Sequence, residues 1–191
     1  MFNIGVLVSG GGTNLQAIID YTKRKDVVAA VKVVISDRPG VFAIERAKRE
    51  EIAHAIIDRK LYKKNLSDKL LELLKDCDLI VLAGFLSILT GDILKVFENR
   101  IINVHPSLIP SFCGPNMYGQ KVHQAALDRG VKISGCTVHI VDTGTDTGPI
   151  LVQKAVPVLK GDTPETLAGR ILPFEHQALC EAIKMFVEGR V

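Results

Sequence analysis

The chain lacks the cysteine spacing of a metal site or a disulfide framework. Its four cysteines, Cys77, Cys113, Cys136 and Cys180, include no C-x-x-C pair. Isolated cysteines in mainly apolar surroundings are typical of a protein from a reducing cytosol. We therefore expect a cytoplasmic protein that uses no metal ion.

A long apolar run is also missing. No window of the sequence approaches the roughly 20 consecutive apolar residues that a membrane-spanning helix needs. The N-terminus, MFNIGVLVSGGG, has a short apolar segment with no basic residues before it, unlike a secretory signal. These absences predict a soluble, unexported protein with no membrane partner.

The chain has no strong excess of charge of either sign. Its 24 Lys and Arg residues against 21 Asp and Glu residues leave a net charge of +3. Apart from the run KRK at 23–25, the basic residues are scattered, so the basic face of a nucleic-acid-binding protein is not indicated. The small positive excess suits an anionic small-molecule substrate.

No repeat, low-complexity segment or linker divides the 191 residues. The chain is 47% hydrophobic and 24% charged, which is a globular composition, and its length suffices for one hydrophobic core. We therefore predict a single domain over residues 1–191 whose two halves share one sheet.

Short apolar runs alternate with amphipathic stretches through the first half of the chain. Strands are predicted over 3–9, 28–36, 53–58, 78–84 and 100–105, and helices over 13–25, 41–51, 66–77 and 91–100. Alternation of this kind is typical of an α/β fold. We predict a doubly wound, mostly parallel twisted sheet with helices on both faces.

The second half has a different order of elements. A helix is predicted over 119–130, strands over 131–141 and 149–158, and a long helix from about 163 to 188. Thr163 followed by Pro164 is a typical helix start, although Asp162 is an alternative cap. Pro173 is expected to kink this last helix.

A glycine-rich loop, SGGGTN, joins the first predicted strand to the first predicted helix. A dinucleotide fingerprint would need a third glycine at Leu15, and a P-loop would need Lys and Ser or Thr at Thr13 and Asn14. Neither motif is present. Two interpretations remain: a cradle for one phosphate, formed by the Thr13 hydroxyl and the amides of residues 12–14, or a turn that lets strand and helix pack closely.

Polar residues interrupt the end of the fifth predicted strand, in RIINVHPSLIPSF at 100–112. Residues two apart on a strand point to the same side, so Asn103 and His105 should face one cavity while Val104 packs the other way. An amide and an imidazole can together stabilise the oxyanion that forms when a nucleophile attacks a carbonyl. The alternative is a core histidine whose ring nitrogens are hydrogen-bonded to backbone carbonyl groups.

A carboxylate near His105 would favour its charged form, and two candidates lie in one glycine-rich loop. These are Asp142 and Asp146, and the residues alone do not choose between them. His139 could form a metal site with these aspartates, but no second ligand has matching spacing, so a metal is not expected.

Several segments together resemble the phosphoribosylglycinamide formyltransferase family, the folate-dependent enzymes of purine synthesis. They are SGGGTNLQAI, LAGFLSIL, INVHPSLIPSF, GCTVHIVDTGTDTGPIL and VPV followed by GDT, in the family order over nearly the whole chain. The resemblance implies the formyltransferase fold with a Rossmann-like N-terminal half. It places a phosphate-binding half at about 1–105 and a folate-binding, catalytic half at about 106–191.

By position in these motifs, the resemblance implies a catalytic set of Asn103, His105 and Asp146, and it thereby selects Asp146 over Asp142. It implies that glycinamide ribonucleotide is bound by Gly12, Thr13, Asn14 and Glu175. The implied folate-binding residues are Lys64, Leu86, Ser87, Ile88, Leu89, Asn103 and Asp142.

The sequence departs from the family pattern at two places. Ser87 stands where many members have arginine, although contacts made by the backbone of this segment would survive that change. The segment CGPNMYGQKVHQAAL, at 113–127, also differs from the shorter family pattern. It is expected to reshape the folate entrance, with Tyr118 and His123 close by.

The implied reaction transfers the formyl group of 10-formyltetrahydrofolate to the amine of glycinamide ribonucleotide. Asn103 and protonated His105 would bind the formyl oxygen, while Asp146 would hold His105 charged and help to move the proton. A 10-formyltetrahydrofolate hydrolase is the alternative, but that branch usually carries an extra N-terminal domain. The expected partners are these small molecules, and the expected assembly is a monomer or a weak homodimer.

Overall fold

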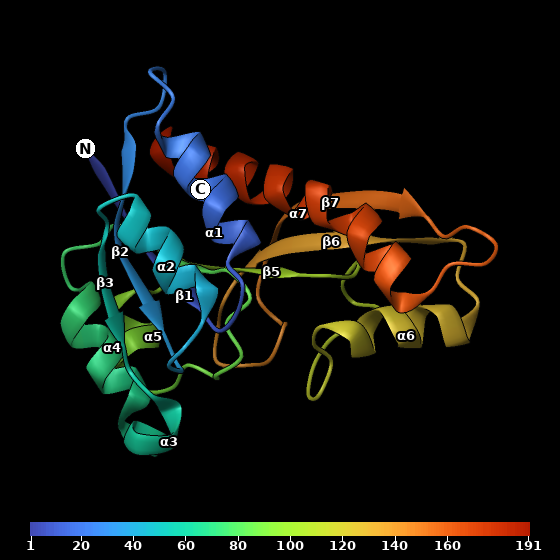
Figure 1. The fold of residues 1–191 in the computed structure, drawn as a ribbon, viewed down its shortest axis with the longest axis horizontal. Coiled ribbons are helices and arrows are strands. Elements are labelled where there is room, and N and C mark those ends of the chain that lie inside the picture. The colour runs from blue at the N-terminus through green and yellow to red at the C-terminus, as the bar shows by residue number, and fades with distance from the viewer.

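The computed structural model describes all 191 residues, which form one seven-stranded sheet covered by helices (Figure 1). The strands are β1 (Phe2–Val8), β2 (Ala29–Ser36), β3 (Ala53–Ile56), β4 (Leu79–Leu82), β5 (Ile101–His105), β6 (Ile133–Ile140) and β7 (Ile150–Pro157). The helices are α1 (Thr13–Thr22), α2 (Phe42–Arg49), α3 (Arg59–Tyr62), the 3-10 helix η1 (Lys63–Asn65), α4 (Leu66–Leu74), α5 (Asp92–Val96), α6 (Gln120–Arg129) and α7 (Pro164–Val187).

The strand order is β3-β2-β1-β4-β5-β6-β7, and the first five strands are parallel. The order reverses between β1 and β4, which is the switch point where open α/β sheets bind ligands at the carboxyl ends of their strands. The predicted doubly wound, mostly parallel sheet is therefore confirmed, and both halves of the chain share it.

Two hydrophobic clusters lie on opposite faces of the sheet. The larger one packs Ile4 and Val6 of β1 against α1, α2 and α7. The smaller one packs Leu7 of the same strand against α4 and α5. Neighbouring residues of β1 enter different clusters because side chains alternate along a strand, so both faces of the sheet are buried under helices.

The last two strands are antiparallel to their neighbours, and the long helix α7 lies across them (Figure 1). The predicted start of α7 is confirmed, because Thr163 forms a reciprocal capping box with Thr166. Asp162 instead binds Arg170 at 2.6 Å. The helix assignment continues through Pro173, and the kink there stays a prediction.

The middle of the chain contains less helix than the sequence predicts. Residues 91–100 form only the short helix α5, and residues 85–90, which follow β4, have no regular structure. Helix α3 and η1 were not predicted, because their few residues give no periodic pattern. No helix of the protein is long and apolar enough to span a membrane.

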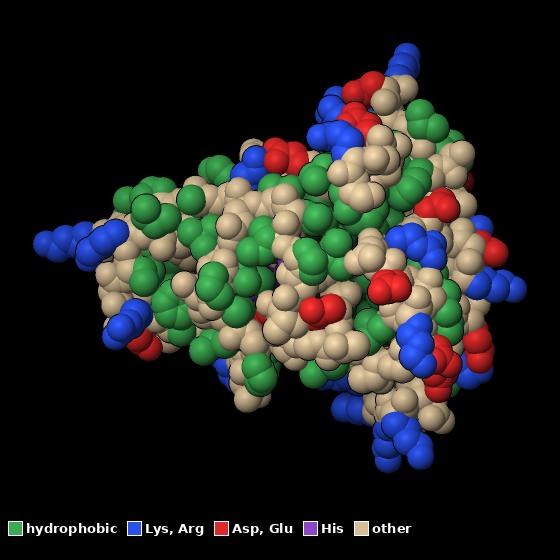
Figure 2. All heavy atoms as spheres, turned by 180° about the vertical axis from the view of Figure 1, so that it is seen from behind, with side chains coloured by type: hydrophobic (Ala, Val, Ile, Leu, Met, Phe, Trp, Pro, Cys, Tyr) green, Lys and Arg blue, Asp and Glu red, His purple; other side chains and the backbone are tan.

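Lysine and arginine side chains project at the periphery of the molecule when it is viewed from behind (Figure 2). The middle of that face is occupied mainly by hydrophobic and uncharged side chains. This distribution agrees with the scattered basic residues of the sequence.

Two glycines offer a matched test of packing. A Cβ at Gly135 on β6 would lie 2.0 Å from the Lys154 carbonyl oxygen on β7, whereas a Cβ at Gly169 on α7 would meet no atom within 4 Å. Gly135→Ala should therefore lower the free energy of unfolding by about 2 kcal/mol or more. Gly169→Ala should raise it by about 0.5–1 kcal/mol, because alanine favours the helix. Urea denaturation measures both free energies of unfolding. Equal changes in the two variants would contradict the close approach of β6 and β7 at Gly135.

Candidate active site

A cavity of about 460 Å³ lies at the carboxyl ends of the central strands. It is lined by 26 residues from both halves of the chain, which include Asn14, the segment 84–89, the segment 103–106, the loop after β6 and Glu175. Its volume is within the usual range for a small-molecule site. Its lining includes the predicted catalytic residues and two of the predicted substrate-binding residues, which are Asn103, His105, Asp146, Asn14 and Glu175.

Asn103 and His105 both line the cavity from the end of β5. Their shared orientation follows from the period of two along a strand, as predicted. Val104 between them packs in the larger hydrophobic cluster and also borders the cavity.

His105 is buried, and protein groups face both of its ring nitrogens. Nε2–H donates a hydrogen bond to the Phe112 carbonyl oxygen at 2.9 Å. Nδ1 lies 3.6 Å from Oδ2 of Asp146. Because that second distance exceeds a hydrogen bond, Nδ1 is the nitrogen that a substrate atom or a water molecule can share with Asp146.

Asp146 lies between two imidazoles. Its Oδ1 is 3.6 Å from Nε2 of His139, and its Oδ2 accepts a hydrogen bond from the Gly114 amide at 2.9 Å. Burial raises the pKa of Asp146, but His139, the Gly114 amide and the charge of His105 together hold this pKa below its ordinary value of 3.8. The carboxylate is therefore ionised at neutral pH.

Asp142 is turned toward its own loop. Its Oδ1 accepts hydrogen bonds from the Gly144 amide at 2.9 Å and from the Thr147 hydroxyl at 2.6 Å. Gly148, which follows Thr147, has no room for a side chain, because a Cβ would lie 1.9 Å from the Ile140 carbonyl oxygen. Asp142 therefore stabilises the tight loop that brings Asp146 to His105, and it borders the cavity as well.

His139 is a site residue whose role the sequence analysis missed. Its Nδ1–H donates to the Ile140 carbonyl oxygen at 2.9 Å, so in the neutral ring Nε2 is an acceptor. Asn103 Nδ2 donates to that Nε2 at 3.2 Å in the neutral ring, whereas a protonated ring directs Nε2–H toward Oδ1 of Asp146 at 3.6 Å. This contact orients the Asn103 amide and leaves its second N–H free. The signal in the sequence was weak, because His139 interrupts an otherwise ordinary alternating strand.

Asn14 and Glu175 meet at the other end of the cavity, although 161 positions separate them. Asn14 Nδ2 donates to Glu175 Oε2 at 2.9 Å, while Oδ1 of Asn14 is buried without a hydrogen-bond partner. Both side chains line the cavity. They therefore present unpaired acceptor oxygens, which suit a ligand rich in hydroxyl donors.

The glycine loop before α1 has free donors. The backbone amides of residues 10–14 donate no hydrogen bond, whereas the carbonyls of Gly10 and Gly11 are bound by Ala43 and Arg46 of α2. Gly12 has φ +74°, and a Cβ there would lie 2.7 Å from that of Ala43. With the loop carbonyls held by α2, its free amides suit an anion at the start of α1.

The segment Leu86–Leu89 also has unpaired backbone groups. The amides of Ser87, Ile88 and Leu89 donate no hydrogen bond, whereas the Leu86 amide donates to the Ser9 hydroxyl at 2.8 Å. All four residues line the cavity. A planar ligand with donors and acceptors along its edge would satisfy these groups.

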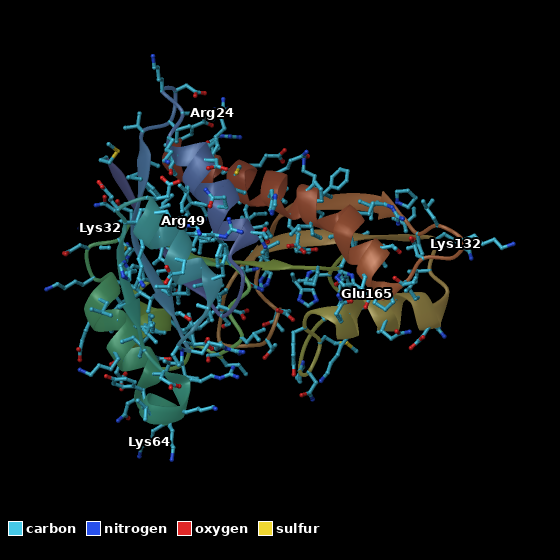
Figure 3. All side chains as sticks on the ribbon, viewed as in Figure 1. Arg24, Lys32, Arg49, Lys64, Lys132 and Glu165 are labelled. Atoms are coloured by element: carbon cyan, nitrogen blue, oxygen red, sulfur yellow. The ribbon has the colours of Figure 1, made fainter.

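Lys64 does not reach this cavity. It lies in η1 and points away from the molecule (Figure 3), and it is not among the lining residues. Arg59 is closer to the lining, because its guanidinium lies 3.5 Å from the buried Asp37, which accepts a hydrogen bond from Ser87 at 2.6 Å.

Tyr118 and His123 line the cavity, as expected for the segment that departs from the family pattern. Burial and the charge of His105 lower the pKa of His123, and its Nδ1 is buried without a partner. No group of three or more His, Cys, Asp or Glu side chains is arranged to hold a metal ion.

Comparisons with known proteins agree with this geometry. The model of the formyl transferase family matches residues 2–183. The chain is 39% identical to phosphoribosylglycinamide formyltransferase of Haemophilus influenzae, over all of this chain and 90% of that protein. It is also 42% identical to the trifunctional purine biosynthetic protein adenosine-3 of Gallus gallus, over 98% of this chain. The chain spans only 19% of the length of that larger relative.

Solved structures show the same fold. Glycinamide ribonucleotide transformylase 1 of Symbiobacterium toebii is 46% identical, with a TM-score of 0.93 over 100% of this chain and 89% of that one. Phosphoribosylglycinamide formyltransferase of Brucella melitensis is 39% identical, with a TM-score of 0.89 over 97% of this chain and 95% of that one.

The partly buried Glu175 predicts a conflict between stability and binding. Burial raises its pKa above the ordinary value of 4.5, although the hydrogen bond from Asn14 opposes this shift. The folded state favours the protonated form of Glu175. The free energy of unfolding therefore falls as the pH rises from the ordinary pKa of 4.5 through the raised pKa of the folded state. Glu175→Gln should therefore be more stable than wild type at neutral pH and about equal to it near pH 4.

Chemical denaturation at the two pH values measures this difference. Glu181→Gln is the matched control, because Glu181 lies on the same helix with a half-exposed side chain. If Glu175→Gln were no more stable than wild type at neutral pH, the burial of an ionised carboxylate there would be refuted.

Proposed function

Because this chain belongs to the phosphoribosylglycinamide formyltransferase family, we propose that it transfers the formyl group of 10-formyltetrahydrofolate to the primary amine of glycinamide ribonucleotide. The products are formylglycinamide ribonucleotide and tetrahydrofolate, in de novo purine biosynthesis in the cytoplasm. One observation carries this proposal: the His105–Asp146 pair and Asn103 line one cavity that extends from Asn14 and Glu175 to the segment Leu86–Leu89.

Glycinamide ribonucleotide binds at the end of the cavity near α1. Its phosphate lies against the free amides of the glycine loop and the Thr13 hydroxyl, at the positive end of the helix. Its ribose hydroxyls donate to Oδ1 of Asn14 and to the Glu175 carboxylate, which are the unpaired acceptors there. The amine is thereby directed toward the end of β5.

The folate co-substrate binds at the opposite end. Its pterin ring pairs with the free backbone groups of residues 87–89 and lies near the loop of Asp142. Backbone recognition explains why serine is tolerated at position 87. Lys64 remains the proposed contact for the folate carboxylates, and its distance from the cavity requires that this part of the folate extends outside it.

The amine attacks the formyl carbon directly, so no protein nucleophile is required. The second N–H of Asn103 donates to the developing oxyanion, a contact whose loss typically costs about 100-fold in rate. Binding both substrates in one cavity makes the attack effectively intramolecular.

Proton movement falls to the His105–Asp146 pair. The attacking nitrogen loses one proton, and the folate nitrogen gains one as its bond to the formyl carbon breaks. His105 Nδ1 faces both the cavity and Asp146, whose carboxylate stabilises the charged imidazole. Because Nε2 of His105 already donates to Phe112, we propose that His105 acts through Nδ1 and that the oxyanion contact belongs to Asn103 alone, which departs from the expectation that both side chains bind the formyl oxygen.

A spectroscopic assay of folate product tests the proposal. Product should form only when glycinamide ribonucleotide is present. Product formation at the same rate without the amine would instead support a hydrolase, and no product under either condition would exclude both activities.

His105→Ala and Asp146→Asn should each lower kcat by about 100-fold or more, because each removes one member of the proton-transfer pair. Both variants should still bind the two substrates, as measured by calorimetry. His54→Ala is the control, since His54 is exposed on the edge strand β3. Full activity in the purified His105→Ala protein would refute the assigned role.

The phosphate cradle predicts a separate effect on binding. Gly12→Ala introduces a Cβ that clashes with Ala43 at a positive φ, so the loop must move. The KM for glycinamide ribonucleotide should rise by about 10-fold or more, since a charge-assisted contact is weakened. The KM for the folate should remain unchanged. A rise confined to the folate KM would place the phosphate elsewhere.

A further inference from the structure

The turn after β5 contacts both members of the catalytic pair through its backbone. The Phe112 carbonyl accepts from His105 Nε2, and the Gly114 amide donates to Asp146 Oδ2, both at 2.9 Å. The two contacts lie two residues apart in the chain. One short segment therefore holds the imidazole at Nε2, the nitrogen turned away from Asp146, and holds Asp146 at Oδ2, the oxygen that faces His105.

Ser107 anchors this turn from within the core. Its hydroxyl is fully buried and donates to the Ser111 carbonyl oxygen at 2.5 Å, with the Phe112 carbonyl oxygen 3.4 Å away. The Ser107 carbonyl in turn accepts from the buried Thr137 hydroxyl at 2.7 Å. The turn is therefore connected through Ser107 to strand β6.

The backbone of the turn is unusual at both contact residues. Phe112 has φ +51°, and Gly114 has φ +91°. A positive φ is costly for phenylalanine, so it persists only where the surroundings determine the conformation. Here the determining contacts are those to Ser107 and His105.

The contacts have a chemical consequence. A carbonyl oxygen can only accept, so Nε2 of His105 keeps its proton and the exchangeable proton is confined to Nδ1, beside Asp146. The Gly114 amide holds the Asp146 carboxylate within reach of that nitrogen. Without these two contacts the ring and the carboxylate could each rotate out of alignment.

We propose that the turn 107–114 positions the His105–Asp146 pair for proton transfer, with Ser107 and Gly114 as positioning residues. This inference rests on the proposed function and deepens it, because it assigns the pairing of two catalytic groups to backbone contacts of this turn, whose Gly114 also borders the cavity. Its contacts to His105 and Asp146 act on the rate of the chemical step, so loss of either contact should lower kcat far more than it changes KM.

Gly114→Ala provides the test, and Gly161→Ala provides a matched control. Gly161 has φ +87°, and at neither glycine would a Cβ meet any atom within 4 Å. The two substitutions thus place alanine at similar positive φ angles, but only Gly114 donates to Asp146. Gly114→Ala should lower kcat by about 10-fold or more, with the KM of each substrate within about 2-fold of wild type. Gly161→Ala should leave kcat unchanged.

Ser107→Ala provides a second, independent variant that removes the anchor without adding an atom. It should reduce kcat in the same manner, again with little change in KM, and circular dichroism should show a folded protein. An unchanged kcat in both variants, an equal loss of kcat in Gly161→Ala, or an effect confined to KM would each overturn the inference.

The wild-type protein is assayed first, which separates this inference from the proposed function. If the wild type makes no amine-dependent product, the proposed function fails. An active wild type with unaffected variants refutes only the positioning role.

Discussion

The arrangement of the site depends on one largely buried carboxylate. Asp146 is within 3.6 Å of His105 and His139 and accepts the Gly114 amide. A carboxylate removed from water is costly unless charges and donors compensate it, so the conformation of the loop after β6 depends on these partners. The same contacts that satisfy Asp146 bring two imidazoles and Asn103 to the mouth of the central strands.

The sheet topology provides those partners. β5 is the last parallel strand, and its neighbour β6 runs in the opposite direction, with Asn103 paired to His139 and His105 paired to Thr137. Directly opposed residues of an antiparallel pair lie close together, so His139 contacts Asn103 and Thr137 anchors the turn that follows His105. Because β6 runs antiparallel to β5, it brings His139 and Thr137 beside the polar end of β5.

Much of the fold and the first members of the site could be predicted from the sequence. The alternation of apolar runs and amphipathic stretches predicted the first five strands, the second half of the sequence predicted the other two, and the period of two along β5 predicted that Asn103 and His105 share a cavity. The residues alone left Asp142 and Asp146 as equal candidates, because spacing does not show how a glycine-rich loop folds. His139 and the Gly114 amide were missed, since one looks like part of a strand and a backbone donor leaves no mark in a sequence.

The sequence by itself determined which segments become strands and which polar side chains stand near their ends, because these depend on local periodicity and on turn-forming residues, although β3 and β4 each end two residues earlier than predicted. Only the tertiary structure decided how those ends are used. Asn14 meets Glu175 across 161 positions, and Phe112 and Gly114 contact a histidine and an aspartate that lie 41 positions apart (146 − 105). Such contacts depend on how the chain is packed, because burial leaves polar groups that must find partners wherever the fold places them.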